Sequence, residues 1–65
     1  MYDALGNGIA VGCVLIGTGL QNAGRYYTVR AIGTTNGRVN LERHIDGKVF
    51  WTFLNYYRVV QEARS

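Results

Sequence analysis

Few residues in this sequence have side chains suited to catalysis or metal binding. It contains one histidine, His44, and one cysteine, Cys13. Neither has a second soft ligand at CxxC or HxxxH spacing, so the sequence predicts no metal site. His44 and Asp46 could exchange a proton, but no nucleophile or oxyanion-stabilising group accompanies them. We therefore expect no catalytic residues, no cofactor and no metal. Asp46 is interpreted as a turn residue and His44 as a solvated strand residue.

The stretch VLIGTGLQNAG (14–24) raises the question of dinucleotide binding. Gly17 and Gly19 form a GxG after an apolar run, as in the dinucleotide-binding fingerprint. The third glycine would fall at position 22, where the residue is Asn22, and no helical pattern follows. The segment is therefore interpreted as a flexible loop. Cys13, inside the apolar run, is interpreted as a small buried hydrophobe.

Length, charge and cysteine content limit the class of protein. We expect one domain over residues 1–65, with residues 1–8 and 62–65 flexible. A single cysteine excludes an internal disulfide and is typical of a reducing cytoplasm, which is the expected location. The apolar run 9–16 is far shorter than the roughly 20 residues of a membrane-spanning helix, and no Lys or Arg precedes it, so no membrane association is expected. The net charge of +3 permits an anionic partner.

Short runs of β-branched and aromatic residues predict an all-β fold. They are bounded by Gly, Asn, Asp or Thr, the sequence has no proline, and no segment shows a sustained helical period. We expect at most a single 3₁₀ turn, before the last strand. The expected strands span residues 9–16, 26–33, 38–45, 48–53 and 56–60.

The loops of two predicted hairpins decide which side chains are buried. Three-residue loops, 35–37 and 45–47, each end in a left-handed glycine. In the second hairpin this loop pairs Leu41 with Trp51 and gathers the apolar side chains on one face, whereas a two-residue loop scatters them.

The register of the first hairpin is chosen by charge. Its three-residue loop sets Arg30 opposite Glu42, whereas a two-residue loop sets Arg30 opposite Arg43. The meander then has a core face and a solvated face. The core face carries Tyr27, Val29, Ala31, Val39, Leu41, Ile45, Val49, Trp51 and Phe53. The solvated face carries Thr28, Arg30, Ile32, Arg38, Asn40, Glu42, His44, Lys48, Phe50 and Thr52.

Arg43 is out of place in this pattern because it shares the core-facing phase. It lies in the last pair before the turn, so its stem can pack against Val29 and Val49 while the guanidinium reaches the rim. There it either pairs with Asp46 or binds a group of a partner. The internal pair is the favoured interpretation because buried charges are normally paired within the protein.

The order of these elements resembles that of the SH3-like small barrels: five short strands, a long glycine-rich loop (17–24), two tight hairpins and a brief turn into the last strand. The resemblance covers nearly the whole chain and implies a five-stranded antiparallel barrel. The size and rhythm are also similar to those of small SH3-like proteins of phages and mobile elements. The acidic loop residues of family members that bind proline-rich peptides are missing from 17–24.

The solvated face predicts a non-enzymatic nucleic-acid-binding module. Basic groups can contact phosphates, and an aromatic ring can stack on a base. Small archaeal chromatin proteins with SH3-like sheets use a corresponding face, so the resemblance favours a DNA or RNA partner, although Glu42 at the centre opposes it. The candidate residues are Arg30, Arg38, Asn40, His44, Lys48 and Phe50.

Two other interpretations stay open. In one, the solvated face is simply a hydrated sheet surface without a function. In the other, the protein binds another protein through exposed tyrosines or a sheet edge, as an inhibitor or assembly subunit, or forms a homo-oligomer. The candidate residues for protein binding are Tyr26, Arg43, Tyr56 and Tyr57.

Overall fold

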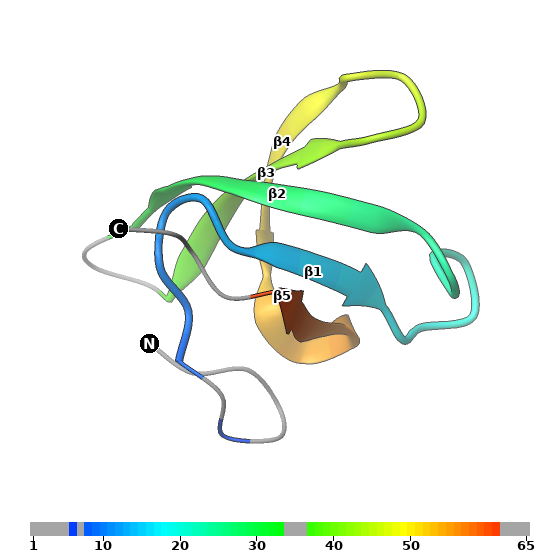
Figure 1. Cartoon of the computed structure of the whole chain (residues 1–65), viewed down its shortest axis with the longest axis horizontal. Helices are drawn as coiled ribbons and strands as arrows, with labels where there is room; N and C mark the ends of the chain where they lie inside the picture. Colours follow the sequence, from blue (N-terminus) through cyan, green and yellow to red (C-terminus); the bar gives the residue numbers. More distant parts are fainter. Residues whose placement is uncertain (1–5, 7, 34–36, 62–65) are drawn as a thin grey trace.

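The computed structural model describes residue 6, residues 8–33 and residues 37–61. They form one antiparallel sheet (Figure 1). Its strands are β1 (Val14–Gly17), β2 (Tyr26–Ile32), β3 (Arg38–Arg43), β4 (Val49–Phe53) and β5 (Tyr57–Gln61). A single 3₁₀ turn, η1 (Leu54–Tyr56), joins β4 to β5. The predicted all-β class, the five strands and the 3₁₀ turn are confirmed. Most of the termini predicted to be flexible lie outside the described residues.

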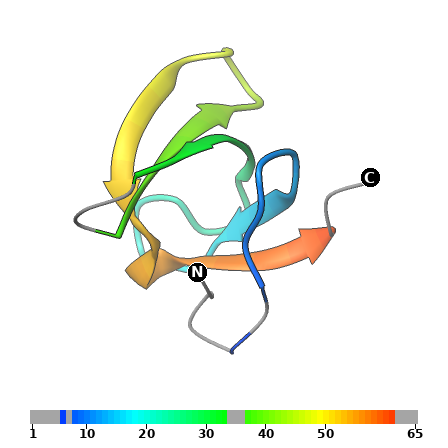
Figure 2. The same cartoon turned by 90° about the vertical axis from the view of Figure 1, so that its left-hand side faces the viewer.

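The strand order is β4-β3-β2-β1-β5, so β4 and β5 form the two edges of the sheet. Figure 2 shows β4 curving along one side of the molecule and η1 turning the chain into β5. Within the described residues, β4 and β5 are not paired with each other, so the sheet is open. The closed barrel implied by the resemblance is therefore not observed.

A glycine turn makes β1 shorter than the predicted strand 9–16. Gly12 has a φ of 98°, a left-handed conformation that glycine adopts readily. Its N–H donates to the carbonyl of Val29 (2.8 Å), and the carbonyl of Cys13 accepts the N–H of Val29 (3.0 Å). The chain therefore meets β2 at Gly12 and Cys13 and enters β1 at Val14, although Ile9 is still buried against the core.

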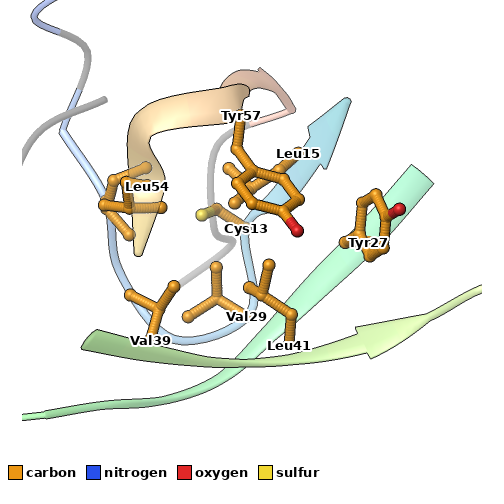
Figure 3. Close-up of a cluster of buried hydrophobic side chains, with 9 residues drawn as sticks. Cys13, Leu15, Tyr27, Val29, Val39, Leu41, Leu54 and Tyr57 are labelled. Carbon is orange, nitrogen blue, oxygen red and sulfur yellow. The ribbon is translucent and has the colours of Figure 1, made fainter. Parts of the chain in front are cut away.

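The core lies on one face of the sheet, where side chains from β1, β2, β3, η1 and β5 converge (Figure 3). The ring of Tyr27 meets that of Tyr57 edge-on at 5.1 Å between centroids and that of Phe50 edge-on at 5.9 Å. The burial of Cys13 is confirmed, whereas Tyr57, a candidate residue for protein binding, is buried. The buried side chains are Ile9, Cys13, Leu15, Tyr27, Val29, Val39, Leu41, Leu54 and Tyr57.

The β3–β4 hairpin is one residue out of the predicted register, since Leu41 pairs with Phe50. The loop has four residues, 44–47, and is closed by the N–H of Arg43 donating to the carbonyl of Lys48 (2.8 Å). Gly47 is left-handed, as predicted. The carboxylate of Asp46 also accepts the N–H of Lys48 (3.1 Å), a local bond that stabilises the longer loop.

This shift turns β4 over relative to the prediction. Phe50 packs against the core, whereas Val49, Trp51 and Phe53 are 50%, 53% and 47% exposed. The predicted burial of these three residues, and the predicted exposure of Phe50, are therefore wrong. Large apolar side chains occupy both alternating sets of positions in β4. The apolar pattern alone therefore assigned the wrong set to the core. Ile45, also predicted to be in the core, lies exposed in the loop.

Strand β2 contains a β-bulge at Arg30. Val29 pairs with Leu41, but Ala31 pairs with Asn40, so Arg30 is the extra residue. Its exposed side chain still reaches Glu42, as predicted from charge, although the backbone register differs from the prediction.

The bulge also exchanges the faces of the two residues that follow it. Ile32 pairs with the buried Val39 and packs against the core, whereas it was predicted to be solvated. Ala31, predicted to face the core, turns outward. At the end of this hairpin the N–H of Gly33 donates to the carbonyl of Arg38 (2.7 Å), and Gly37 is left-handed, as predicted. Residues 34–36 of the predicted turn lie outside the described residues.

Candidate functional site

The side of β2, β3 and β4 turned away from the core, called the outer face below, gathers most of the residues with binding chemistry. Side chains alternate between the two faces along each strand, so the outer face follows from the buried set. His44, at the end of β3, joins it by contacting Thr28. The outer face consists of Tyr26, Thr28, Arg30, Ala31, Arg38, Asn40, Glu42, Val49, Trp51 and Phe53.

Strand β4 contributes a row of three apolar side chains to the outer face: Val49, Trp51 and Phe53. Each is about half exposed, and β4 is an edge strand, so no neighbouring strand of the described sheet covers the row from the side. Isolated apolar residues on a surface are ordinary, whereas these three lie in one row on one strand.

Arg38 supplies positive charge at one end of this row. It is the cross-strand partner of Phe53, and its guanidinium carbon lies 5.2 Å from the centre of the phenyl ring. This is a cation–π arrangement. The guanidinium N–H groups that are directed away from the ring can donate to an anionic oxygen.

The middle of the outer face carries a second arginine together with an acid. Arg30 Nη1 lies 3.0 Å from Glu42 Oε1, and the two side chains are 59% and 35% exposed. Arg30 and Arg38 against Glu42 leave the face with a charge of +1. Asn40 is the cross-strand partner of Trp51, which places its amide beside the indole ring.

The far end of the outer face is formed by His44. Its Nε2 lies 2.6 Å from Thr28 Oγ1, its backbone N–H donates to the carbonyl of Tyr26 (3.0 Å), and its ring lies 6.5 Å from that of Tyr26. A shallow cavity of about 300 Å³ lies here, lined by Gly24, Arg25, Tyr26, His44 and Ile45. His44 therefore bonds to a hydroxyl, and no acid–base pair with Asp46 is formed.

Asp46 instead pairs with Arg43. The guanidinium donates from Nε to Oδ1 (2.9 Å) and from Nη2 to Oδ2 (2.6 Å), a bidentate ion pair. These bonds, with that from the Lys48 N–H, hold the pKa of the Asp46 carboxyl well below its usual range. The same pair raises the pKa of Arg43. The predicted internal pair is confirmed.

The structure therefore divides the six residues predicted to bind nucleic acid. Arg30, Arg38, Asn40 and His44 share the outer face, whereas Phe50 belongs to the core. Lys48 is exposed, but it lies two residues before Phe50. By strand alternation it is therefore on the same side as Phe50 and not on the outer face with Trp51.

Sequence reasoning missed Val49, Trp51 and Phe53 as outer-face residues. The signal that could have found them was the stretch HIDG (44–47), read as a four-residue loop with Asp46 bonding the next strand.

A separate cleft of about 430 Å³ lies between η1 and the loop that follows β1. The N–H of Thr18 donates to the carbonyl of Tyr56 (2.8 Å), and Asn22 Nδ2 donates to the same oxygen (3.3 Å). The loop predicted to be flexible is thus anchored to η1. Leu20 and Tyr56 line the cleft with exposed apolar surface.

The glycines of this loop are explained by packing. A side chain at Gly17 would overlap the backbone carbonyl of Asn22, and one at Gly19 would crowd Asn22 and Tyr56. The strand that follows the loop is β2, and no helix begins there. The GxG therefore serves loop packing, in agreement with the interpretation against a dinucleotide site.

The described residues show neither a metal-binding cluster nor a membrane-spanning helix, and the comparisons with known proteins found no match for the chain. Among the described residues, no group of three or more His, Cys, Asp or Glu could hold a metal ion. No helix within the described ranges is long and apolar enough to cross a membrane. No match was found among models of protein families, among curated proteins or among solved structures.

Proposed function

We propose that the protein is a non-enzymatic nucleic-acid-binding module that uses the outer face of β2, β3 and β4. The observation that carries this proposal is the exposed row of Val49, Trp51 and Phe53 beside Arg38. Stacking of a base on an aromatic side chain contributes about 1–3 kcal/mol, and arginine donates to phosphate oxygens.

The exposure of this row supports a bound partner. A domain of 65 residues buries little apolar surface, so leaving these side chains half exposed forgoes stability that a small core needs. A partner that covers the row would bury these side chains and so recover that stability. The partner we propose is anionic because the chain carries +3 overall and the outer face +1 with the charge of Glu42 included.

The proposal also covers the fold family and the biological setting of the protein. The strand order and the 3₁₀ turn before β5 support an SH3-like arrangement, here with an open sheet. Small size and strand rhythm support a role as a cytoplasmic accessory protein of a phage or mobile element.

Trp51 is the only tryptophan, so its fluorescence reports directly on the proposed site. The test is a titration with DNA and RNA oligonucleotides of mixed sequence at 50 and 200 mM salt. Arg38→Gln should weaken binding, while Arg58→Gln, which removes the same charge from β5 at the opposite edge of the sheet, should weaken it less. Absence of salt-sensitive binding to any oligonucleotide would reject the proposal.

A second candidate, binding of a protein partner, is favoured by the cleft beside η1. Of the four residues predicted for this role, Tyr57 is buried and Arg43 is paired with Asp46, which leaves Tyr26 and Tyr56 exposed. Leu20 adds apolar surface next to Tyr56. If this function is the correct one, Tyr56→Ala should abolish binding of the partner while Arg38→Gln leaves it unchanged.

A further inference from the structure

Resting on the proposed function, we infer that the outer face binds single-stranded rather than double-stranded nucleic acid, with one base stacked on Trp51 and the next on Phe53. The inference comes from the spacing of the two rings, the small number of cations, and the positions of Asn40 and Glu42 beside the row.

Ring spacing is the first step. Trp51 and Phe53 are two residues apart on one strand, so their Cα atoms are separated by about 6.6 Å along it. Successive bases in a duplex are only about 3.4 Å apart on each strand, and both faces of each base are already covered by stacking. A single strand can splay its bases and present their faces to side chains. The row therefore fits two neighbouring unstacked bases.

The supply of charge is the second step. Double-stranded DNA binders that make 6–10 phosphate contacts need a correspondingly basic surface. Within the described part of the chain, the outer face has two arginines, Arg30 and Arg38, and Arg30 is already engaged by Glu42. One or two phosphate contacts suffice for a short single strand when stacking supplies the remaining affinity.

The neighbours of the row determine how the strand is placed. Arg38 adjoins Phe53, so it can hold the phosphate at that end. Asn40 adjoins Trp51, and its amide offers both donors and an acceptor to the edge of the stacked base. Glu42 adjoins Val49 and repels phosphate at the other end. The site should therefore hold about two bases, because the row carries two rings, Trp51 and Phe53.

The test compares single strands with hairpin duplexes of the same length and composition, in both DNA and RNA, by labelled-oligonucleotide anisotropy at 50 mM salt. We expect single strands to bind at least about tenfold more tightly than duplexes. Trp51→Leu and Phe53→Leu should each weaken binding by about 5- to 160-fold, the equivalent of the stacking energy of one base on one ring. Trp51→Phe, which keeps a ring, should retain most of the affinity, and Val60→Ala, on β5 at the opposite edge of the sheet, is the apolar control.

Each outcome decides a different point. Equal or tighter binding of duplexes, still weakened by Arg38→Gln, would overturn the single-strand inference and leave the proposed function standing. Single-strand binding that survives both leucine substitutions would overturn the stacking. Failure to bind any oligonucleotide would overturn the proposed function itself. Circular dichroism checks that the variants are folded; if Trp51→Leu is not, Phe53→Leu and Trp51→Phe still decide the question.

Discussion

Glutamine in place of Glu42 should strengthen nucleic-acid binding and make it more sensitive to salt. In the parent, Arg30 Nη1 is held at 3.0 Å by Glu42 Oε1, so that among the described outer-face residues Arg38 is the cation ready to meet a phosphate. The substitution raises the charge of the outer face from +1 to +2 and releases Arg30. Because the ion pair is largely exposed, its loss should cost no more than about 1 kcal/mol of stability.

The size of the effect follows from counterion release. Each phosphate contact of a single strand contributes a slope of about −0.7 to a plot of log affinity against log salt. One contact gives a loss of about 2.6-fold between 50 and 200 mM salt, and a second contact from Arg30 raises that loss to about 7-fold. Removal of one like charge near the phosphate should also tighten binding about fivefold at low salt, as expected for about 1 kcal/mol of Coulomb energy in water.

The assay is Trp51 fluorescence with a short single strand at five salt concentrations. Asp46→Asn serves as the matched control because it changes the net charge by the same amount outside the outer face. A slope unchanged by Glu42→Gln, or one raised equally by Asp46→Asn, would show that total charge rather than the outer face governs binding.

Three further predictions concern the fold. Leu41→Ala should cost about 2–5 kcal/mol in urea unfolding and Trp51→Ala only about 1 kcal/mol or less; equal costs would contradict the observed register. Gly17→Ala should lower the melting temperature, since the new methyl overlaps a loop carbonyl, and an unchanged value in calorimetry would show that the loop is not anchored. The folded pKa of Asp46 is depressed, so its ion pair stabilises the protein fully above the unfolded pKa, about 4, and this contribution is lost as pH falls towards the folded value. The stability difference between parent and Asp46→Asn should therefore shrink below pH 4, and a constant difference in denaturant titrations down to pH 2 would refute it.

The sequence predicted the strands well because their signals are local. Turn residues bound each apolar run, and the left-handed glycines Gly37 and Gly47 are where the turn chemistry requires them. The Arg43–Asp46 pair could also be predicted because both groups belong to one hairpin. Strand β1 was the exception, since a turn at Gly12 lies inside a continuous apolar run.

Register was harder to predict because it depends on contacts between strands. In β3 the apolar residues alternate cleanly, so Arg38 and Asn40 were assigned to the correct face. In β4 both Phe50 and Trp51 are large and apolar, and a loop longer by one residue exchanges their faces. The polar half of the candidate site was therefore predicted and its aromatic half was missed.

The position of the aromatic row on an edge strand has a consequence for handling the protein. The segment VFWTF (49–53) is uncharged, strongly β-forming and free of proline. In the described sheet, no strand pairs with its free backbone edge. Such a segment is a template for edge-to-edge aggregation. Lys48 immediately precedes this segment. Its charge should disfavour in-register pairing of β4 with the β4 strand of a second molecule. Concentrated solutions should therefore be least prone to fibre formation when a ligand covers β4, and neutralising Lys48 should shorten the lag before aggregation.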